Sequence, residues 1–185
     1  MEISDRPLSP GGFWRRFFVI LVTVGTHTQG FRRLIEATDD LAARGVIREP
    51  VEAQIGCTDY EPRVLSWSRS FPYDEFYRKV AAARLVITHA GAGIIILCRR
   101  EGKRMIVAPR QKKFGEHTND HQLELAREIE EQGLAPVVYD MDDLPRALQE
   151  AAGNNPAKKD CRDLPAARII ESFLSRVTPS GRGAG

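Results

Sequence analysis

Short apolar runs alternate with amphipathic segments along most of the chain. The runs FFVILVTV, VEAQIG, VLSWS, LVITH, MIVAP and APVVYD begin at residues 17, 51, 64, 85, 105 and 135. Because they are apolar without strict alternation, they are typical of parallel strands that are covered on both faces. Helical spacing marks residues 31–41, 73–82, 117–131 and 142–152, and a further helix that ends near residue 100. This order predicts an α/β fold with a Rossmann-like, doubly wound parallel sheet.

The length of the chain favours a single domain. A sequence of 185 residues is long enough for one well-buried core and short for two. We expect residues 13–177 to form this domain, which closes with an amphipathic helix over residues 164–177. Residues 1–12 are expected to form a flexible leader and residues 178–185 a flexible tail.

Composition and charge exclude several classes of protein. A net charge of +2 is too small for a nucleic-acid surface, so we expect no nucleic-acid partner. The 3 cysteines have no paired spacing, which indicates a reducing, cytoplasmic setting without a zinc or disulfide framework. The first apolar run is too short for a membrane span, and the strand, turn and helix pattern that follows argues against a signal peptide. The acidic segment YDMDD stands where a helix begins, so we expect capping there and no metal.

Three loops are expected to meet at the carboxyl edge of the sheet, where parallel α/β sheets bind their ligands. They are residues 25–30, 88–93 and 109–120. In the second loop, THAGAG places small residues before a helix, so that backbone N–H groups can approach an anion such as a diphosphate. Tight packing of strand against helix would need the same small residues, and both interpretations stay open. In the first loop, Thr26, His27 and Thr28 face the same crevice, although Thr28 could instead cap the next helix.

The third loop, RQKKFGEHTNDHQ, is longer than a simple strand-to-helix connection of about 2 to 6 residues. Such length predicts a functional loop. Its cations at positions 110, 112 and 113 could neutralise a phosphate or a sugar carboxylate, while Glu116, Asp120 and Gln122 could bind hydroxyl groups. The alternative is a solvated loop in which Glu116 and Asp120 cap the following helix.

The segments VTVGT, ITHAGAG and VAPRQKKFGEHTNDHQLELA together resemble the donor-binding C-terminal domain of glycosyltransferase family 28. The resemblance spans residues 17–152 and is to the short, stand-alone subunits of bacterial exopolysaccharide and capsule glycosyltransferases. More distantly, the chain is similar to the catalytic subunit of the eukaryotic two-subunit enzyme that adds the second N-acetylglucosamine to dolichol-linked sugar. The resemblance implies one lobe of a GT-B glycosyltransferase that binds a UDP-sugar. It also implies that the acceptor lobe is a separate, membrane-anchored polypeptide.

By analogy with this family, the first two loops lie against the diphosphate, residues 71–73 near the uracil and residues 116–122 around the sugar. The implied donor-binding residues are Gly25, Thr26, Phe71, Tyr73, His89, Gly91, Ala92, Gly93, Arg110, Asp120, His121 and Gln122. Family members often carry a Thr after HAGAG and an acidic residue one turn later that holds the ribose. This sequence has Ile94 and Leu97 there, which leaves Glu116 as a candidate substitute.

The resemblance implies inverting transfer, in which an acceptor hydroxyl on a polyprenyl-diphosphate-linked saccharide displaces UDP without a cofactor or metal. Candidate bases in this chain are His27, His117 and Glu116, and the alternative is a base on the acceptor lobe. We expect a cytoplasmic protein held at the inner face of the membrane by its partner. A non-catalytic nucleotide-sugar-binding or regulatory subunit is the main alternative. A nucleotide-dependent oxidoreductase is disfavoured because GTH, not GxGxxG, follows the first strand. Glucuronic acid, galactose, glucose and N-acetylglucosamine all remain open as the transferred sugar.

Overall fold

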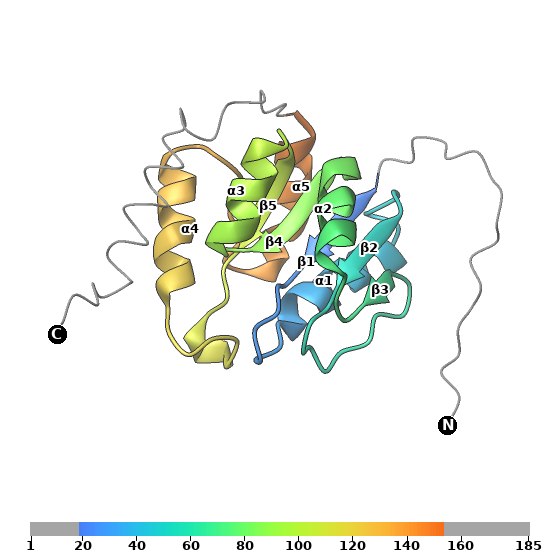
Figure 1. The fold of residues 1–185 in the computed structure, drawn as a ribbon, viewed down its shortest axis with the longest axis horizontal. Helices are drawn as coiled ribbons and strands as arrows, with labels where there is room; N and C mark the ends of the chain where they lie inside the picture. Colours follow the sequence, from blue (N-terminus) through green and yellow to red (C-terminus); the bar gives the residue numbers. More distant parts are fainter. Residues whose placement is uncertain (1–18, 154–185) are drawn as a thin grey trace, which may run out of the picture.

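A computed structural model describes residues 19–153, which form a parallel sheet between two layers of helices (Figure 1). The strand order is β3-β2-β1-β4-β5. The strands are β1 (Ile20–Thr23), β2 (Val51–Gln54), β3 (Ser66–Ser68), β4 (Leu85–His89) and β5 (Arg104–Ala108). The helices are α1 (Arg32–Ala43), α2 (Tyr73–Ala82), α3 (Ala92–Arg100), α4 (His121–Glu131) and α5 (Leu144–Gly153), with 3-10 turns η1 (Lys112–Phe114) and η2 (Met141–Asp143). The predicted Rossmann-like, doubly wound fold is confirmed, while the leader, the last helix and the tail lie outside the described residues.

The central strands are apolar throughout because helices cover both faces of the sheet. Side chains alternate along β1, so Ile20 packs in the cluster with Leu34 of α1, and Leu21 packs in the cluster with Ile95 of α3. Helices α1 and α5 cover the first face, and α2, α3 and α4 cover the second (Figure 1). Burial of each of these apolar side chains contributes about 1.5 to 3 kcal/mol to the stability of the fold. The strand order reverses between β1 and β4, and this is where such sheets open a crevice at their carboxyl edge.

Three sequence predictions of local structure are corrected. The run APVVYD forms no strand, because it pairs with β5 only through an isolated bridge at Val137 and its Pro136 has no N–H to donate. The helix predicted over residues 117–131 begins at His121. Thr28 does not cap α1. The helix begins at Arg32, and the backbone N–H of Phe31, the residue before it, donates to the hydroxyl of the distant Thr58.

The predicted capping role of the YDMDD segment is confirmed. The Asp140 side chain accepts a hydrogen bond from the backbone N–H of Asp142 at the start of η2, with 3.1 Å between the Asp142 nitrogen and Oδ1. A carboxylate at this position satisfies a backbone donor that the first turn leaves unpaired. Asp140 therefore has a structural explanation.

A buried carboxylate on α1 organises the connection between β2 and β3. Asp39 Oδ1 accepts N–H bonds from Val64 (3.0 Å) and Leu65 (3.2 Å), and its Oδ2 accepts from the N–H of Arg63 (3.0 Å) and the hydroxyl of Tyr60 (2.7 Å). Burial alone raises the pKa of Asp39, but these donors outweigh burial and lower it from 3.8 to about 2. The ionised carboxylate is thus part of the folded state.

We expect Asp39→Asn to lower the free energy of unfolding by about 2 kcal/mol at neutral pH, because an amide accepts fewer and weaker bonds than a carboxylate. Since the pKa of Asp39 is lower in the folded state, its stabilisation is present above about pH 4 and is lost as the pH falls towards 2. Urea unfolding of the full chain between about pH 4 and 2 measures this: as the pH falls, the free energy of unfolding should decrease less in the variant than in the unaltered chain.

The adjacent Asp40 provides a matched control. Its side chain is 52% exposed and forms a surface ion pair with Arg63. Asp40→Asn is therefore expected to change the free energy of unfolding by less than about 0.5 kcal/mol. An equal decrease in the free energy of unfolding for the two variants would contradict the assigned role of Asp39. So would an Asp39→Asn variant whose stability depends on pH as that of the unaltered chain does.

Candidate functional site

The carboxyl ends of β1 and β4 open into a cavity of about 390 Å³. The cavity is lined by Thr23, Gly25, Thr26, Gln54, Phe71, Tyr73, Phe76, His89, Gly91, Gly93 and Ile94. The first two predicted loops therefore converge as the sheet topology requires, and they bring seven of the predicted donor-binding residues into one cavity. The predicted residues in this set are Gly25, Thr26, Phe71, Tyr73, His89, Gly91 and Gly93. Their binding roles remain predictions.

The imidazole of His89 lies against two glycines at the floor of the cavity. A Cβ atom at Gly91 would lie 2.3 Å from His89 Nε2, and one at Gly25 would lie 2.8 Å from His89 Cε1. Gly25 also has a φ of 73°, a backbone conformation that is strained for a residue with a side chain. Burial, and then the charge of Arg110, lower the pKa of His89 to about 4, so the ring is neutral at pH 7. Both glycines are thus required by the close approach of one ring.

The N-terminus of α3 faces this cavity through Gly91 and Gly93. Gly91 occupies the capping position, and no side-chain bond from the described residues caps the helix. The first turn also has no acidic residue, so its N–H groups and the positive end of the helix dipole are uncompensated. Such a helix start is suited to binding a phosphate group.

The remaining walls combine an aromatic side with a polar floor. Phe71 is held by Lys79, whose ammonium lies 4.6 Å from the ring centroid, and Tyr73 beside it is 78% exposed. On the floor, the hydroxyl of Thr23 donates to Gln54 Oε1 over 2.5 Å. The sequence prediction missed Thr23 and Gln54, although polar residues that end buried apolar strands were the available signal. It also missed Phe76 on the aromatic side.

Arg110 does not line the cavity and is only 1% exposed. Its guanidinium donates to the carbonyl oxygens of Val24 (2.6 Å), Gln29 (2.7 Å), Gly30 (3.0 Å) and Glu116 (2.9 Å). Burial lowers its pKa to about 10, which leaves it charged at neutral pH. The prediction of a direct contact between Arg110 and a diphosphate is therefore corrected: its guanidinium clamps the first and third loops together.

The polar residues of the third loop bind the loop itself. Gln122 Oε1 accepts the N–H of Arg110 (3.1 Å), and Asp120 Oδ1 accepts the N–H of Lys112 (2.9 Å). Asp120 stands before α4 but makes no capping bond to it, so the capping alternative is wrong for this residue. His121 lies 3.8 Å from Glu124, measured between Nδ1 and Oε1, one turn along α4. Neither Asp120, His121 nor Gln122 lines the 390 Å³ cavity.

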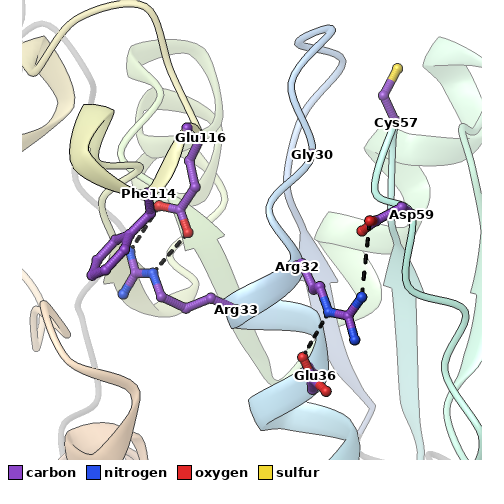
Figure 2. Close-up of a pocket in the computed structure, with 9 residues that line it drawn as sticks. Gly30, Arg32, Arg33, Glu36, Cys57, Asp59, Phe114 and Glu116 are labelled. Carbon is purple, nitrogen blue, oxygen red and sulfur yellow. Dashed lines mark hydrogen bonds and ion pairs between the residues drawn. The ribbon is translucent and has the colours of Figure 1, made fainter.

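Glu116 lies in a second cavity, of about 530 Å³, and is bound by a cation (Figure 2). Its Oε1 is 2.8 Å from Arg33 Nε, and its Oε2 is 3.0 Å from Arg33 Nη2 and accepts the N–H of Gln111. Figure 2 shows this pair beside Phe114, whose ring packs over the same guanidinium. Glu116 therefore does not cap α4, the helix that follows the loop, and with both oxygens engaged it is not a free base.

His27 and His117 bring the first and third loops into contact. Their rings stack with centroids 4.4 Å apart and an interplanar angle of 28°. Nδ1 of His27 accepts the N–H of Gln29 (3.1 Å), and Nδ1 of His117 accepts the N–H of Asn119 (3.3 Å). Burial, His27 and Arg110 lower the pKa of His117. Because each Nδ1 lone pair is occupied, neither ring is a ready base in this arrangement.

Two further observations concern the part of the chain that the structure describes. Residues 19–153 contain no group of three or more His, Cys, Asp or Glu side chains placed to hold a metal ion. Within the same range, every helix is too short or too polar to cross a membrane.

Comparison with known proteins identifies one family. The model of the glycosyltransferase family 28 C-terminal domain matches residues 19–172. A search of curated proteins found no match.

Solved structures share the fold at low sequence identity. The glycotransferase of kitacinnamycin matches with 22% identity and a TM-score of 0.57, over 91% of this chain and 42% of that one. The solution structure of ALG13 matches with 15% identity and a TM-score of 0.56, over 85% of this chain and 96% of that one. MurG from Acinetobacter baumannii matches with 17% identity and a TM-score of 0.51, over 85% of this chain and 45% of that one. The chain thus spans less than half of two of these proteins.

The two glycines of the HAGAG turn give a prediction on stability. Gly91→Ala is expected to lower the free energy of unfolding by about 1 to 3 kcal/mol, because the added methyl group collides with the His89 ring. A Cβ atom at Gly93 meets nothing within 4 Å, so Gly93→Ala should leave stability unchanged or raise it by up to about 1 kcal/mol. Urea unfolding of both variants measures the difference. Indistinguishable stabilities would contradict the packing of His89 between its glycines.

Proposed function

The chain belongs to the glycosyltransferase family 28 C-terminal domain family, and from that premise we propose that it binds the donor of an inverting UDP-sugar glycosyltransferase. In this proposal it is the catalytic subunit for extending a polyprenyl-diphosphate-linked saccharide in exopolysaccharide or capsule synthesis. A membrane-anchored, acceptor-binding subunit supplies the second lobe and holds the complex at the cytoplasmic face of the membrane. The observation that carries the proposal is the uncapped start of α3 within the 390 Å³ cavity.

The cavity has the parts that a nucleoside diphosphate needs. The first-turn N–H groups of α3 suit the diphosphate, and Gly25 and Gly91 leave room for close approach of the backbone. The aromatic side, Phe71 and Tyr73, suits the flat uracil ring. A volume of about 390 Å³ falls within the range of small-ligand sites. The sugar would then extend from the diphosphate towards the loops that carry His27 and His117.

The proposed reaction has two electrostatic requirements. As the acceptor oxygen attacks the anomeric carbon, the bond from that carbon to UDP breaks and negative charge develops on the diphosphate. The start of α3 supplies preorganised donors for this charge. The acceptor hydroxyl must also lose a proton, yet Glu116 is paired with Arg33 and the two histidines have occupied Nδ1 atoms. This supports a base on the acceptor lobe.

The lack of a free base among these three residues also favours one alternative. In it, the subunit binds the nucleotide sugar without catalysing transfer. The two proposals differ in what donor binding does for transfer. If the chain presents the donor for reaction, a substitution that blocks the start of α3 abolishes transfer by the reconstituted pair of subunits. If the chain is regulatory, transfer continues with an unchanged KM for the donor.

Gly93 allows the donor site to be tested without disturbing the fold. Gly93→Asp places a carboxylate in the first turn of α3, where it favours the helix but repels a diphosphate. We expect isothermal titration of the full chain with UDP to show at least about tenfold weaker binding, equivalent to about 1.4 kcal/mol. The thermal midpoint should be unchanged or higher.

The control is Gly93→Asn, which has nearly the same shape and no charge. It should bind UDP within about threefold of the unaltered chain, a difference of about 0.7 kcal/mol. Equal affinities of the Asp and Asn variants would contradict the placement of the diphosphate. An unaltered chain that does not bind UDP at millimolar concentration would contradict the proposed function itself.

A further inference from the structure

The stacked histidines present N–H groups, not lone pairs, to their surroundings. A backbone N–H can only donate, so the Nδ1 atoms of His27 and His117 that receive such bonds carry no hydrogen. The hydrogen of each ring is therefore on Nε2. Within residues 19–153, neither Nε2 has a hydrogen-bond partner. Two stacked rings thus offer two unused donors on loops that meet beside the donor cavity.

These donors lie next to the cavity that we assign to the donor. Thr26, the residue before His27, lines that cavity. His89 lines it as well, and both stacked histidines contribute to the electrostatic lowering of its pKa. The pair therefore lies at the border of this cavity, next to the lining residue Thr26.

The charge around the pair favours an anion. Arg110 donates to carbonyl oxygens of both loops, and no carboxylate of residues 19–153 forms an ion pair with it, although the charge of Glu116 acts on it at longer range. The nearby Glu116 is already neutralised by Arg33. Lys112 and Lys113 are exposed on the same loop. Two N–H donors in such a positive region suit a negatively charged oxygen better than a neutral one.

We propose that the Nε2–H groups of His27 and His117 together bind an anionic oxygen of the donor. This inference rests on the proposed function and specifies the chemistry of its substrate. The oxygen belongs either to the carboxylate of a uronic acid sugar or to the diphosphate. In both cases the histidines position the donor through hydrogen bonds to this oxygen, and they do not remove the acceptor proton.

The test uses pairs of substitutions that separate the two ring nitrogens. An Asn at either position places an acceptor oxygen near Nδ1 and no donor near Nε2, whereas a Gln places an N–H near Nε2. Isothermal titration of the full chain with UDP-glucuronic acid should show about five- to tenfold weaker binding for His27→Asn and His117→Asn. His27→Gln and His117→Gln should stay within about threefold of the unaltered chain, which is less than 1 kcal/mol.

Two further ligands identify the source of the oxygen. If the Asn variants lose affinity for UDP-glucuronic acid but not for UDP-glucose or UDP, the oxygen is the sugar carboxylate. If they lose affinity equally for all three, it is in the diphosphate. A loss for UDP-glucose and UDP-glucuronic acid with UDP unchanged would overturn the inference in favour of a neutral hydroxyl.

Two outcomes separate this inference from the proposed function. If the unaltered chain binds UDP and the Asn variants bind all three ligands normally, the inference fails and the donor site stands. If the unaltered chain binds none of them, both fail. Long-range ¹H–¹⁵N spectra give a second readout, because they report the ring hydrogen directly. Protonation at Nδ1 of either histidine would overturn the inference, whereas Nε2 protonation and a higher pKa of His117 after UDP-glucuronic acid is added would support it.

Discussion

The buried guanidinium of Arg110 is the interaction on which the carboxyl edge of the sheet depends. It joins the carbonyl oxygens of Val24, just after β1, and Gln29, in the first loop, to that of Glu116 in the third. A buried charge persists only where such partners compensate the loss of water, so the loops and the cation hold one another in place. Because the clamp fixes both loops, it also fixes Gly25 against His89 and His27 against His117.

The polar residues of this edge fall into two groups. Those of the long third loop, such as Glu116, Asp120 and Gln122, mostly bind the protein itself and give the loop one conformation. Among residues 19–153, the donors left open at this edge include backbone N–H groups at the start of α3 and the two Nε2–H groups of the stacked histidines. The candidate bases Glu116, His27 and His117 are thus engaged, while N–H donors remain open. This distribution suits the binding of an anionic leaving group, and it is consistent with a base that comes from another lobe.

The sequence predicted the features that depend on local patterns. Apolar runs located all five strands, and the glycines of VGTH and HAGAG located the cavity, because parallel strands must end at one edge. Contacts between distant residues were not predictable. Arg33 and Glu116 are 83 positions apart, and nothing local indicates that they pair, so the sequence alone suggests a ligand or a base at Glu116. Arg110 was misassigned for the same reason, since its partners are backbone carbonyls that one sequence does not distinguish.

In the proposed function, the donor diphosphate binds at the start of α3 and not in the larger cavity beside Arg33. An amide ¹H–¹⁵N titration of the full chain with UDP tests this most directly. We expect the largest changes in amide shift at Thr26, Gly91 and Gly93, which line the first cavity, and little change at Asp59 and Gly115 of the second cavity. The largest changes at Asp59 and Gly115, with Gly91 and Gly93 unaffected, would contradict it.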